Sequence, residues 1–170
     1  MYLLEHDGKA LLARHGIPLP AGCLHTADHK PALPPGPWVV KAQITAGGRG
    51  KAGLIKTADS VAEVAARSAE ILGKSAKGRT VRAVRIEQQV HGASEAYLSM
   101  MLDPAEAGVR IIMAASGGMD IEALSREALK TATAAPDVAT LAATAEKLAA
   151  TIPGATGKAL AEAGRKMAAA

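Results

Sequence analysis

Apolar residues at helical spacing mark the start of the chain, "MYLLEHDGKALLARHG". Because side chains three and four residues apart share one face of a helix, this spacing predicts an amphipathic helix. The helix is expected to end at Gly16, with Pro18 just beyond. Its apolar positions are Leu3, Leu4, Leu11 and Leu12.

The segment 59–74, "DSVAEVAARSAEILGK", has the clearest helical pattern of the chain. Ser60 and Glu63 have the spacing of a capping box, in which the side chain of each residue accepts a hydrogen bond from the backbone N–H of the other. Gly73 predicts the end of this helix. Its apolar face consists of Val61, Val64, Ala65, Ile71 and Leu72.

Short apolar or alternating runs predict strands in the remaining first two thirds of the chain. "WVVKAQI" (38–44) and "LIKT" (54–57) are expected to pair as a hairpin over the loop between them. "RTVRAVRIEQQV" (79–90) alternates Val81, Val84 and Ile86 with charged neighbours and is expected to end at His91-Gly92. Two further strands, "EAYLSMML" and "VRIIMAA", are expected to be joined by the turn "DPAEAG".

Alanine dominates the last third of the chain, which we expect to be helical from Ile121 onward. Pro136 and the "IPG" at 152–154 would divide it into about three short helices. A proline-rich connector, "KPALPPGP" (30–37), precedes the first strand of the hairpin. The order of helices and strands predicts an α/β (α+β) fold.

The composition restricts the class of partner. Basic residues exceed acidic ones and give a net charge of +4, which favours anionic partners. Aromatic residues make up only 2% of the chain, so stacking platforms for nucleic-acid bases are scarce and no nucleic-acid partner is expected. Cys23 is the sole cysteine and excludes an internal disulfide. No signal peptide, transit segment or transmembrane run is recognised, so a cytoplasmic protein without a membrane partner is expected.

The stretch "KAQITAGGRGKAG" (41–53) places four glycines and three cations directly after a predicted buried strand. The P-loop pattern fails here, because Ala52 follows Gly50-Lys51 and Thr45 stands at the position of the first glycine. The pattern G-x-G-x-x-G is satisfied at 48–53, but a dinucleotide fold requires a helix directly afterwards, and a strand follows. A glycine flap inside a β-hairpin, whose backbone N–H groups reach phosphate oxygens, fits this order of elements.

Four segments together resemble the N-terminal part of the β subunit of succinyl-CoA ligase, an ATP-grasp protein; malate-CoA ligase is a close relative. The resemblance extends from residue 1 to about residue 130 and is most specific in the second segment. The segments are "EHDGKALLARHGIPLPAG", "GPWVVKAQITAGGRGKAGLIK", "IEQQVHGASEAYL" and "IIMAASGGMDIE".

The resemblance implies a site for ATP or GTP. Lys41 would contact the nucleotide phosphates, and Gly48, Arg49 and Gly50 would form the flap over them. Glu87 would lie beside the amino group of the base with the backbone of Val90 next to it. Glu95 would face the ribose, since a carboxylate accepts hydrogen bonds from hydroxyl groups.

The sequence also departs from the family pattern. It contains no Asn, so the acidic–Asn-Pro metal motif of the family is missing, and Mg²⁺ is expected only in the complete enzyme. The segment "AASGGMDIE" is one residue shorter than the family's glycine motif and lacks its acidic residue. It either keeps that motif or only starts a helix, with Asp120 near its N-terminus. No residue of the chain is predicted to be catalytic or to bind a metal.

Residues 1–170 are therefore expected to form part of one ATP-grasp domain. It would comprise an N-terminal helix (1–19), a nucleotide-flap lobe (20–95) and the start of an incomplete second lobe (96–170). The resemblance implies an α subunit and the remainder of the β subunit as partners, in an enzyme that joins an acid to CoA with NTP hydrolysis. The alternative is a non-catalytic module for nucleotide binding or subunit interaction. Either way, the chain alone is expected to show no turnover.

The final helices carry apolar stripes for which the sequence predicts no covering strand. Such stripes can fold back on the chain's own sheet, fray, or pack in a second copy, and a homodimer is the preferred expectation. The stripes consist of Leu141, Leu148, Ile152, Leu160 and Met167.

Overall fold

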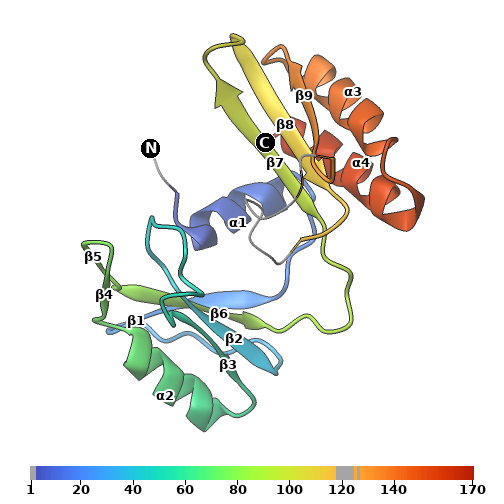
Figure 1. The fold of residues 1–170 in the computed structure, drawn as a ribbon. Coiled ribbons are helices and arrows are strands. Elements are labelled where there is room, and N and C mark those ends of the chain that lie inside the picture. The colour runs from blue at the N-terminus through green and yellow to red at the C-terminus, as the bar shows by residue number, and fades with distance from the viewer. Residues whose placement is uncertain (1–2, 118–124, 126) are drawn as a thin grey trace. The chain divides into compact units, whose positions relative to one another are not determined.

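The computed structural model describes residues 3–117, 125 and 127–170 (Figure 1). The chain forms two compact units: the first unit comprises Met1–Leu11 and Pro18–His91, and the second unit comprises Leu12–Ile17 and Gly92–Ala170. Each unit combines helices with an antiparallel sheet, which confirms the predicted mixed fold class. The segment from Gly118 to Leu124, which carries most of the "SGGMDIE" prediction, lies outside the described residues.

The sheet of the first unit has four strands in the order β1-β6-β2-β3, all antiparallel to their neighbours. The predicted hairpin is confirmed, since Trp38 of β2 lies opposite Ala58 of β3 and Lys41 lies opposite Ile55. Sequence reasoning missed β1, whose short "GCLHT" pattern lacks a clear alternation. The strands are β1 (Gly22–Thr26), β2 (Trp38–Ala42), β3 (Ile55–Ala58) and β6 (Ala83–Gln88).

Helix α2 (Val61–Ile71) confirms the helix predicted over 59–74. It covers the apolar face of this sheet. The Ser60 hydroxyl accepts a hydrogen bond from the Glu63 N–H at 3.2 Å, which caps the helix. The return bond differs from the prediction, because the Glu63 carboxylate accepts from the N–H of Asp59 at 2.7 Å and not from that of Ser60. The core beneath α2 includes Val40, Leu54, Val64, Ile71, Val81, Val84 and Ile86.

The opposite face of the same sheet is polar and lies against helix α1 (Glu5–Arg14). The helix ends as predicted, with Gly16 at a φ of +75°, a backbone conformation that glycine adopts at little cost. Lys41 of β2 lies opposite Arg85 of β6, so both side chains project toward α1. Strand β6 is therefore covered on both faces, and its residues from Ala83 to Glu87 are all buried.

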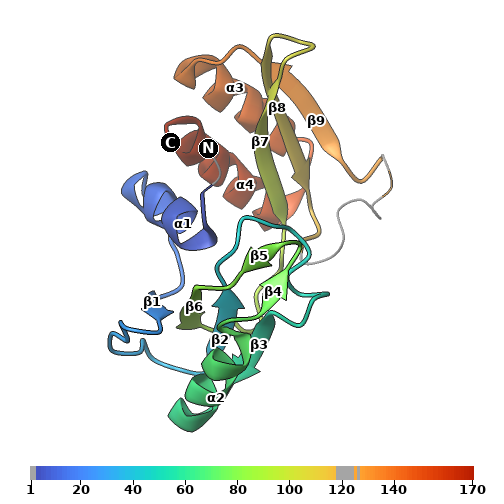
Figure 2. The same ribbon diagram turned by 90° about the vertical axis from the view of Figure 1, so that its left-hand side faces the viewer.

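The predicted strand over 79–90 is interrupted after Thr80. A small hairpin of β4 (Ser75–Ala76) and β5 (Arg79–Thr80) precedes β6. The N–H of Val81 then bonds the Lys74 carbonyl at 2.8 Å, and the Val81 side chain enters the core. The hairpin lies next to the loop after β2, where a Cβ atom placed on Gly48 would be 3.6 Å from Lys77 Nζ (Figure 2).

The sheet of the second unit consists of β7 (Tyr97–Asp103), β8 (Gly108–Ala114) and β9 (Lys130–Ala134). The first two strands and their turn confirm the prediction. The helical prediction for "KTATA" is wrong, because this segment pairs with β8 along its length. Its burial alternates with a period of two, so pairing with the open edge of β8 outweighs the helix propensity of alanine.

Helices α3 (Val138–Ala149) and α4 (Gly154–Ala168) pack on one face of that sheet (Figure 1). They replace the three short helices that were expected, and the "IPG" segment separates them as predicted. Ile152 and Leu160 are each 5% exposed and share a core with Ile111 and Met113 of β8. The expectation that no strand covers the apolar stripes of the last helices is therefore wrong, because the helices pack on the sheet of their own unit. The reason for preferring a homodimer no longer applies. In the part of the chain that is described, no helix is long and apolar enough to cross a bilayer.

Two helical glycines differ in their surroundings and provide a test of this packing. We expect Gly164→Ala to lower the free energy of unfolding by about 1–3 kcal/mol, because its Cβ would lie 2.7 Å from Ala145 Cβ in the α3–α4 contact. Gly8→Ala in α1 should raise it by about 1 kcal/mol through helix propensity, since nothing lies within 4 Å of its Cβ. Urea unfolding measures both values, and a shift of both variants in the same direction would contradict the packing.

Candidate functional site

Six charged side chains gather on the polar face of the first unit's sheet; we call them the charged cluster. They come from three elements that are distant in sequence: helix α1, the end of β2 with the loop after it, and strand β6. Four positive charges face two carboxylates, so two positive charges remain unbalanced. The members are Glu5, Lys9, Lys41, Arg49, Arg85 and Glu87.

Glu87 is the most enclosed member, with a side chain that is 4% exposed. Its Oε2 accepts hydrogen bonds from Lys9 Nζ at 2.6 Å and from Arg85 Nε at 2.8 Å, and its Oε1 accepts from Lys41 Nζ. Burial alone would raise the pKa of Glu87, but the hydrogen bonds from Lys41, Lys9 and Arg85 outweigh it and lower the pKa. The carboxylate is therefore held ionised and fixes the direction of the Lys41 side chain.

Glu5, the first residue of α1, bridges three cations. Its Oε1 lies 3.0 Å from Lys9 Nζ and 3.3 Å from Lys41 Nζ, and its Oε2 lies 2.7 Å from Arg49 Nη2. Burial alone would raise the pKa of Glu5. The charge of Lys41, the hydrogen bond from Lys9 and the charges of Lys9 and Arg49 reverse that effect and lower the pKa to about 2.

The loop after β2 folds back over the end of its strand. The N–H of Ala52 bonds the Gly48 carbonyl at 3.1 Å, and the N–H of Leu54 bonds the Arg49 carbonyl at 2.9 Å. Gly48 has a φ of +77°, which an L side chain rarely adopts. The Arg49 side chain turns down toward the sheet, where its Nη1 donates to the Ala42 carbonyl at 2.8 Å. The predicted flap residue Arg49 thus belongs to the same cluster as Lys41.

Close packing beneath the cluster orders the Arg85 side chain. A Cβ atom on Gly22 would lie 2.6 Å from Arg85 Nη2 and 2.8 Å from Glu87 Cβ, so only glycine leaves room at this position of β1. Arg85 Nη1 is 2.9 Å from His6 Nδ1, and the His6 N–H donates to Gln43 Oε1 at 2.9 Å. These contacts bind the first turn of α1 to the sheet.

The remaining predicted site residues lie outside the cluster. Gly50 is in the loop, and its carbonyl accepts from the Gly53 N–H at 3.0 Å. Val90 follows β6 and is 61% exposed. Glu95 is exposed and belongs to the second unit. Lys41, Arg49 and Glu87 are therefore the three predicted residues that the structure brings together.

Sequence reasoning missed half of the cluster: Glu5, Lys9 and Arg85. A signal was present for each of them. Glu5 and Lys9 have the i,i+4 spacing of an ion pair within a helix, and Arg85 alternates with apolar residues in a strand. These signals predict an exposed face, and only the pairing of distant segments turns that face into a buried contact.

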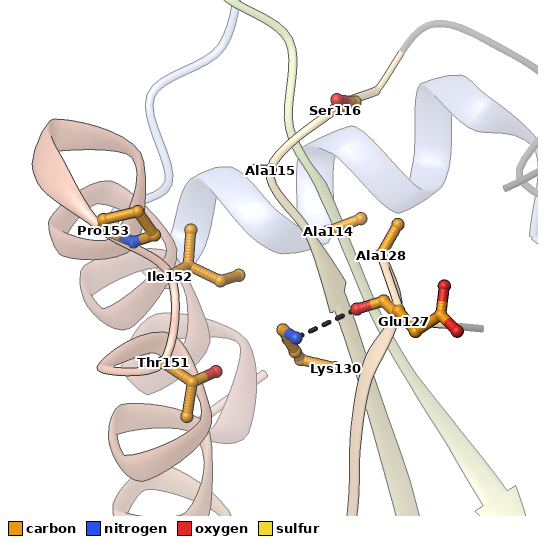
Figure 3. Close-up of a pocket in the computed structure, with 9 residues that line it drawn as sticks. All are labelled: Ala114, Ala115, Ser116, Glu127, Ala128, Lys130, Thr151, Ile152 and Pro153. Carbon is orange, nitrogen blue, oxygen red and sulfur yellow. Dashed lines mark hydrogen bonds between the residues drawn. The ribbon is translucent and has the colours of Figure 1, made fainter. Parts of the chain in front are cut away.

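Two of the cavities that described residues line lie away from the charged cluster. One of about 310 Å³ lies in the second unit, between the α3–α4 connection and the ends of β8 and β9 (Figure 3). Its Lys130 ammonium donates to the Glu127 carbonyl at 2.9 Å. The other, of about 480 Å³, lies between α2 and residues 25–33 of the first unit. Neither is lined by a predicted site residue, and the described residues contain no group of three or more His, Cys, Asp or Glu suited to a metal ion.

Residues 2–164 match the family model described as an ATP-grasp domain. The chain is 39% identical over 137 residues to the succinate–CoA ligase [ADP-forming] subunit beta of Acidithiobacillus ferrooxidans, an alignment covering 74% of this chain and 35% of that protein. It is 37% identical over 131 residues to the [GDP-forming] subunit beta of Thermus thermophilus, covering 75% of this chain and 35% of that protein. The chain thus spans about a third of the length of these relatives.

Solved structures support the fold at lower sequence identity. A structure of ATP citrate lyase from Methanothrix soehngenii in complex with citrate and coenzyme A matches with a TM-score of 0.71 at 19% identity, covering 99% of this chain and 42% of that one. A dinucleotide-forming acetyl-coenzyme A synthetase 1 from Ca. Korarchaeum cryptofilum matches with a TM-score of 0.63 at 19% identity. This alignment covers 96% of this chain and 79% of that one.

The low pKa of Glu5 predicts how acid affects stability. A carboxylate with a lowered pKa in the folded state stabilises the protein above its unfolded pKa of 4.5, and this contribution is lost as the pH falls toward 2. Between these limits, the wild type should therefore lose more unfolding free energy than Glu5→Gln, which has no carboxylate to protonate. Urea unfolding at stepped pH measures the difference.

The control for this experiment is Glu146→Gln, which removes a carboxylate from an exposed pair with Arg165. It should keep the wild-type dependence on pH in the same window. Parallel curves for the wild type and Glu5→Gln would contradict the assigned pKa.

Proposed function

Because the chain belongs to the ATP-grasp family, we propose that the charged cluster and the loop above it bind the phosphates of a nucleotide, ATP or GTP. One observation carries the proposal: two unbalanced positive charges converge beside a glycine-rich loop at the end of a strand. Because a phosphate chain carries several negative charges, it complements this excess. The family match and the ADP- and GDP-forming relatives support the same ligand class.

Lys41 and Arg49 are the proposed phosphate contacts. Lys41 is rigidly placed, because it lies on β2 and its ammonium bonds the enclosed carboxylate of Glu87. Arg49 is held at the base of the loop by the Ala42 carbonyl. Gly48 and Gly50 would let the loop backbone approach phosphate oxygens without a side chain in the way. Such a site neutralises and positions charge and carries out no covalent step.

The positions proposed for the base and the ribose rest on the family resemblance. A carboxylate offers about four lone-pair sites, and Glu87 uses three of them for Lys9, Lys41 and Arg85. One site is left for the amino group of a base. The backbone of Val90 would lie beside the same base, and Glu95 would bind the ribose hydroxyls. Mg²⁺ would accompany the nucleotide in the complete enzyme, and we assign it no ligand among the described residues.

At the level of the whole enzyme, we propose that the chain is the nucleotide-binding part of a CoA ligase of the succinate–CoA ligase type. That reaction converts an acid, CoA and NTP into acyl-CoA, NDP and phosphate, with an α subunit and the rest of a β subunit as partners. The relatives support this proposal over the shared third of their length. A non-catalytic nucleotide-binding or subunit-interaction module is the alternative. Acyl-CoA formation after addition of an α subunit and the remaining β segment supports the first, and nucleotide binding without any such activity supports the second.

The proposed phosphate site predicts unequal effects of two lysines. Lys41→Ala should weaken ATP binding by about 1.5–3 kcal/mol, roughly 10- to 150-fold in Kd, because a charge-assisted hydrogen bond from a fixed position is lost. Lys51→Ala should weaken it less, because Lys51 lies in the exposed part of the loop. Titration calorimetry measures both affinities, with circular dichroism as a check on folding. Equal affinities for wild type and Lys41→Ala would exclude this site.

A further inference from the structure

The cations of the proposed phosphate site already hold an anion that belongs to the chain. The Glu5 carboxylate lies 2.7 Å from Arg49 Nη2 and 3.3 Å from Lys41 Nζ. These are the two side chains assigned to the phosphates. A carboxylate in that position has the same charge sign as a phosphate oxygen and comparable hydrogen-bonding geometry.

Of the two carboxylates in the cluster, Glu5 is the one that can leave. Glu87 accepts three hydrogen bonds, is 4% exposed and lies on a strand paired on both sides. Glu5 is 18% exposed and lies at the beginning of a helix. Its Oε2 is close to Arg49, but no donor among the described residues is aligned with it for a hydrogen bond. The contact of Glu5 with Arg49 is therefore a short ion pair that no aligned hydrogen bond reinforces.

If a phosphate displaced Glu5, the charge of Glu5 would still be compensated. The cations left behind would attract an anion more strongly. Glu5 keeps its ion pair with Lys9, four residues along α1, and stays at the N-terminal end of a helix, which favours negative charge. Once Glu5 withdraws, Lys41, Arg49 and Arg85 share the cluster with one carboxylate, Glu87, which pairs with Lys41 and Arg85. Three positive charges then face one negative charge, which suits a multiply charged phosphate group.

We propose that Glu5 is an internal stand-in for a phosphate group: without nucleotide it holds Arg49 and the loop against α1, and a nucleotide phosphate displaces it. This proposal rests on the proposed function and adds a regulatory element to the same site. Nucleotide binding would then exchange one anion for another at Arg49. The loop would be released from α1 and free to follow the nucleotide.

The test compares the wild-type chain with Glu5→Gln, which keeps the shape of the side chain and removes its charge. We expect Glu5→Gln to bind ATP roughly tenfold more tightly, because no competing carboxylate has to be displaced. Without ligand, the backbone amides of residues 47–53 should exchange hydrogen faster in the variant. Calorimetry with ATP and with inorganic tripolyphosphate, together with hydrogen exchange, measures these effects.

A second variant and a control make the test specific. Glu5→Asp keeps the charge but is one methylene too short to reach Arg49, and it should show a smaller gain of the same sign. Glu146→Gln removes one negative charge from an exposed pair in the second unit and should bind ATP like the wild type. If Glu146→Gln gained as much affinity for ATP as Glu5→Gln, the effect would come from net charge alone, and the proposal would be overturned.

The remaining outcomes separate this proposal from the proposed function. If the wild type binds ATP and Glu5→Gln binds it equally or more weakly, Glu5 only positions the cations. The proposal that Glu5 stands in for a phosphate is then wrong, but the proposed phosphate site is not contradicted. If neither wild type nor Glu5→Gln binds ATP or tripolyphosphate, both proposals fail. Tighter binding together with faster loop exchange in Glu5→Gln supports both.

Discussion

The ion pair between Lys41 and Glu87 is the interaction on which the first unit depends. It lies on the polar face of the sheet, between neighbouring central strands, and Glu87 is almost completely enclosed. A buried carboxylate is tolerated only when charge and hydrogen bonds compensate it, and removal of one partner is costly. Lys9, Arg85 and the first turn of α1 complete that compensation. The helix, the loop and strands β2 and β6 are therefore tied to one another through charge.

The sequence predicts contiguous features of this fold well. The glycine loop, its hairpin and helix α2 could be read from local patterns, because turn residues and apolar spacing act within a few residues. Strand β9 could not, since "KTATA" becomes a strand only through the free edge of β8. The charged cluster was half predicted for the same reason. Lys41, Arg49 and Glu87 follow from a family resemblance, whereas Glu5 and Arg85 gain their role from contacts across more than 30 residues of chain.

The proposed phosphate site differs from an open basic patch, because it is built around internal carboxylates. In an open patch, cations are kept apart by repulsion and are ordered only when the ligand arrives. In the charged cluster, Glu5 and Glu87 hold the cations in defined positions. Such pre-organisation reduces the entropy that binding must remove, and the competing carboxylate offsets part of that gain. In the proposed site, the affinity for a nucleotide would depend on how much more strongly the cations bind a phosphate than they bind Glu5.

The alternation of apolar and charged residues along strand β6 also restricts the register in which the sheet can pair. Its apolar residues Val84 and Ile86 enter the core, and the alternating Arg85 and Glu87 meet α1. A shift of pairing by one residue would carry two charges into the core and expose the apolar pair, so misaligned sheets are strongly disfavoured. Strand β9 carries mainly threonine and alanine side chains, so the same shift would cost less there. The pairing register is thus more strongly specified in the sheet that bears the charged cluster than at β9 in the sheet of the second unit.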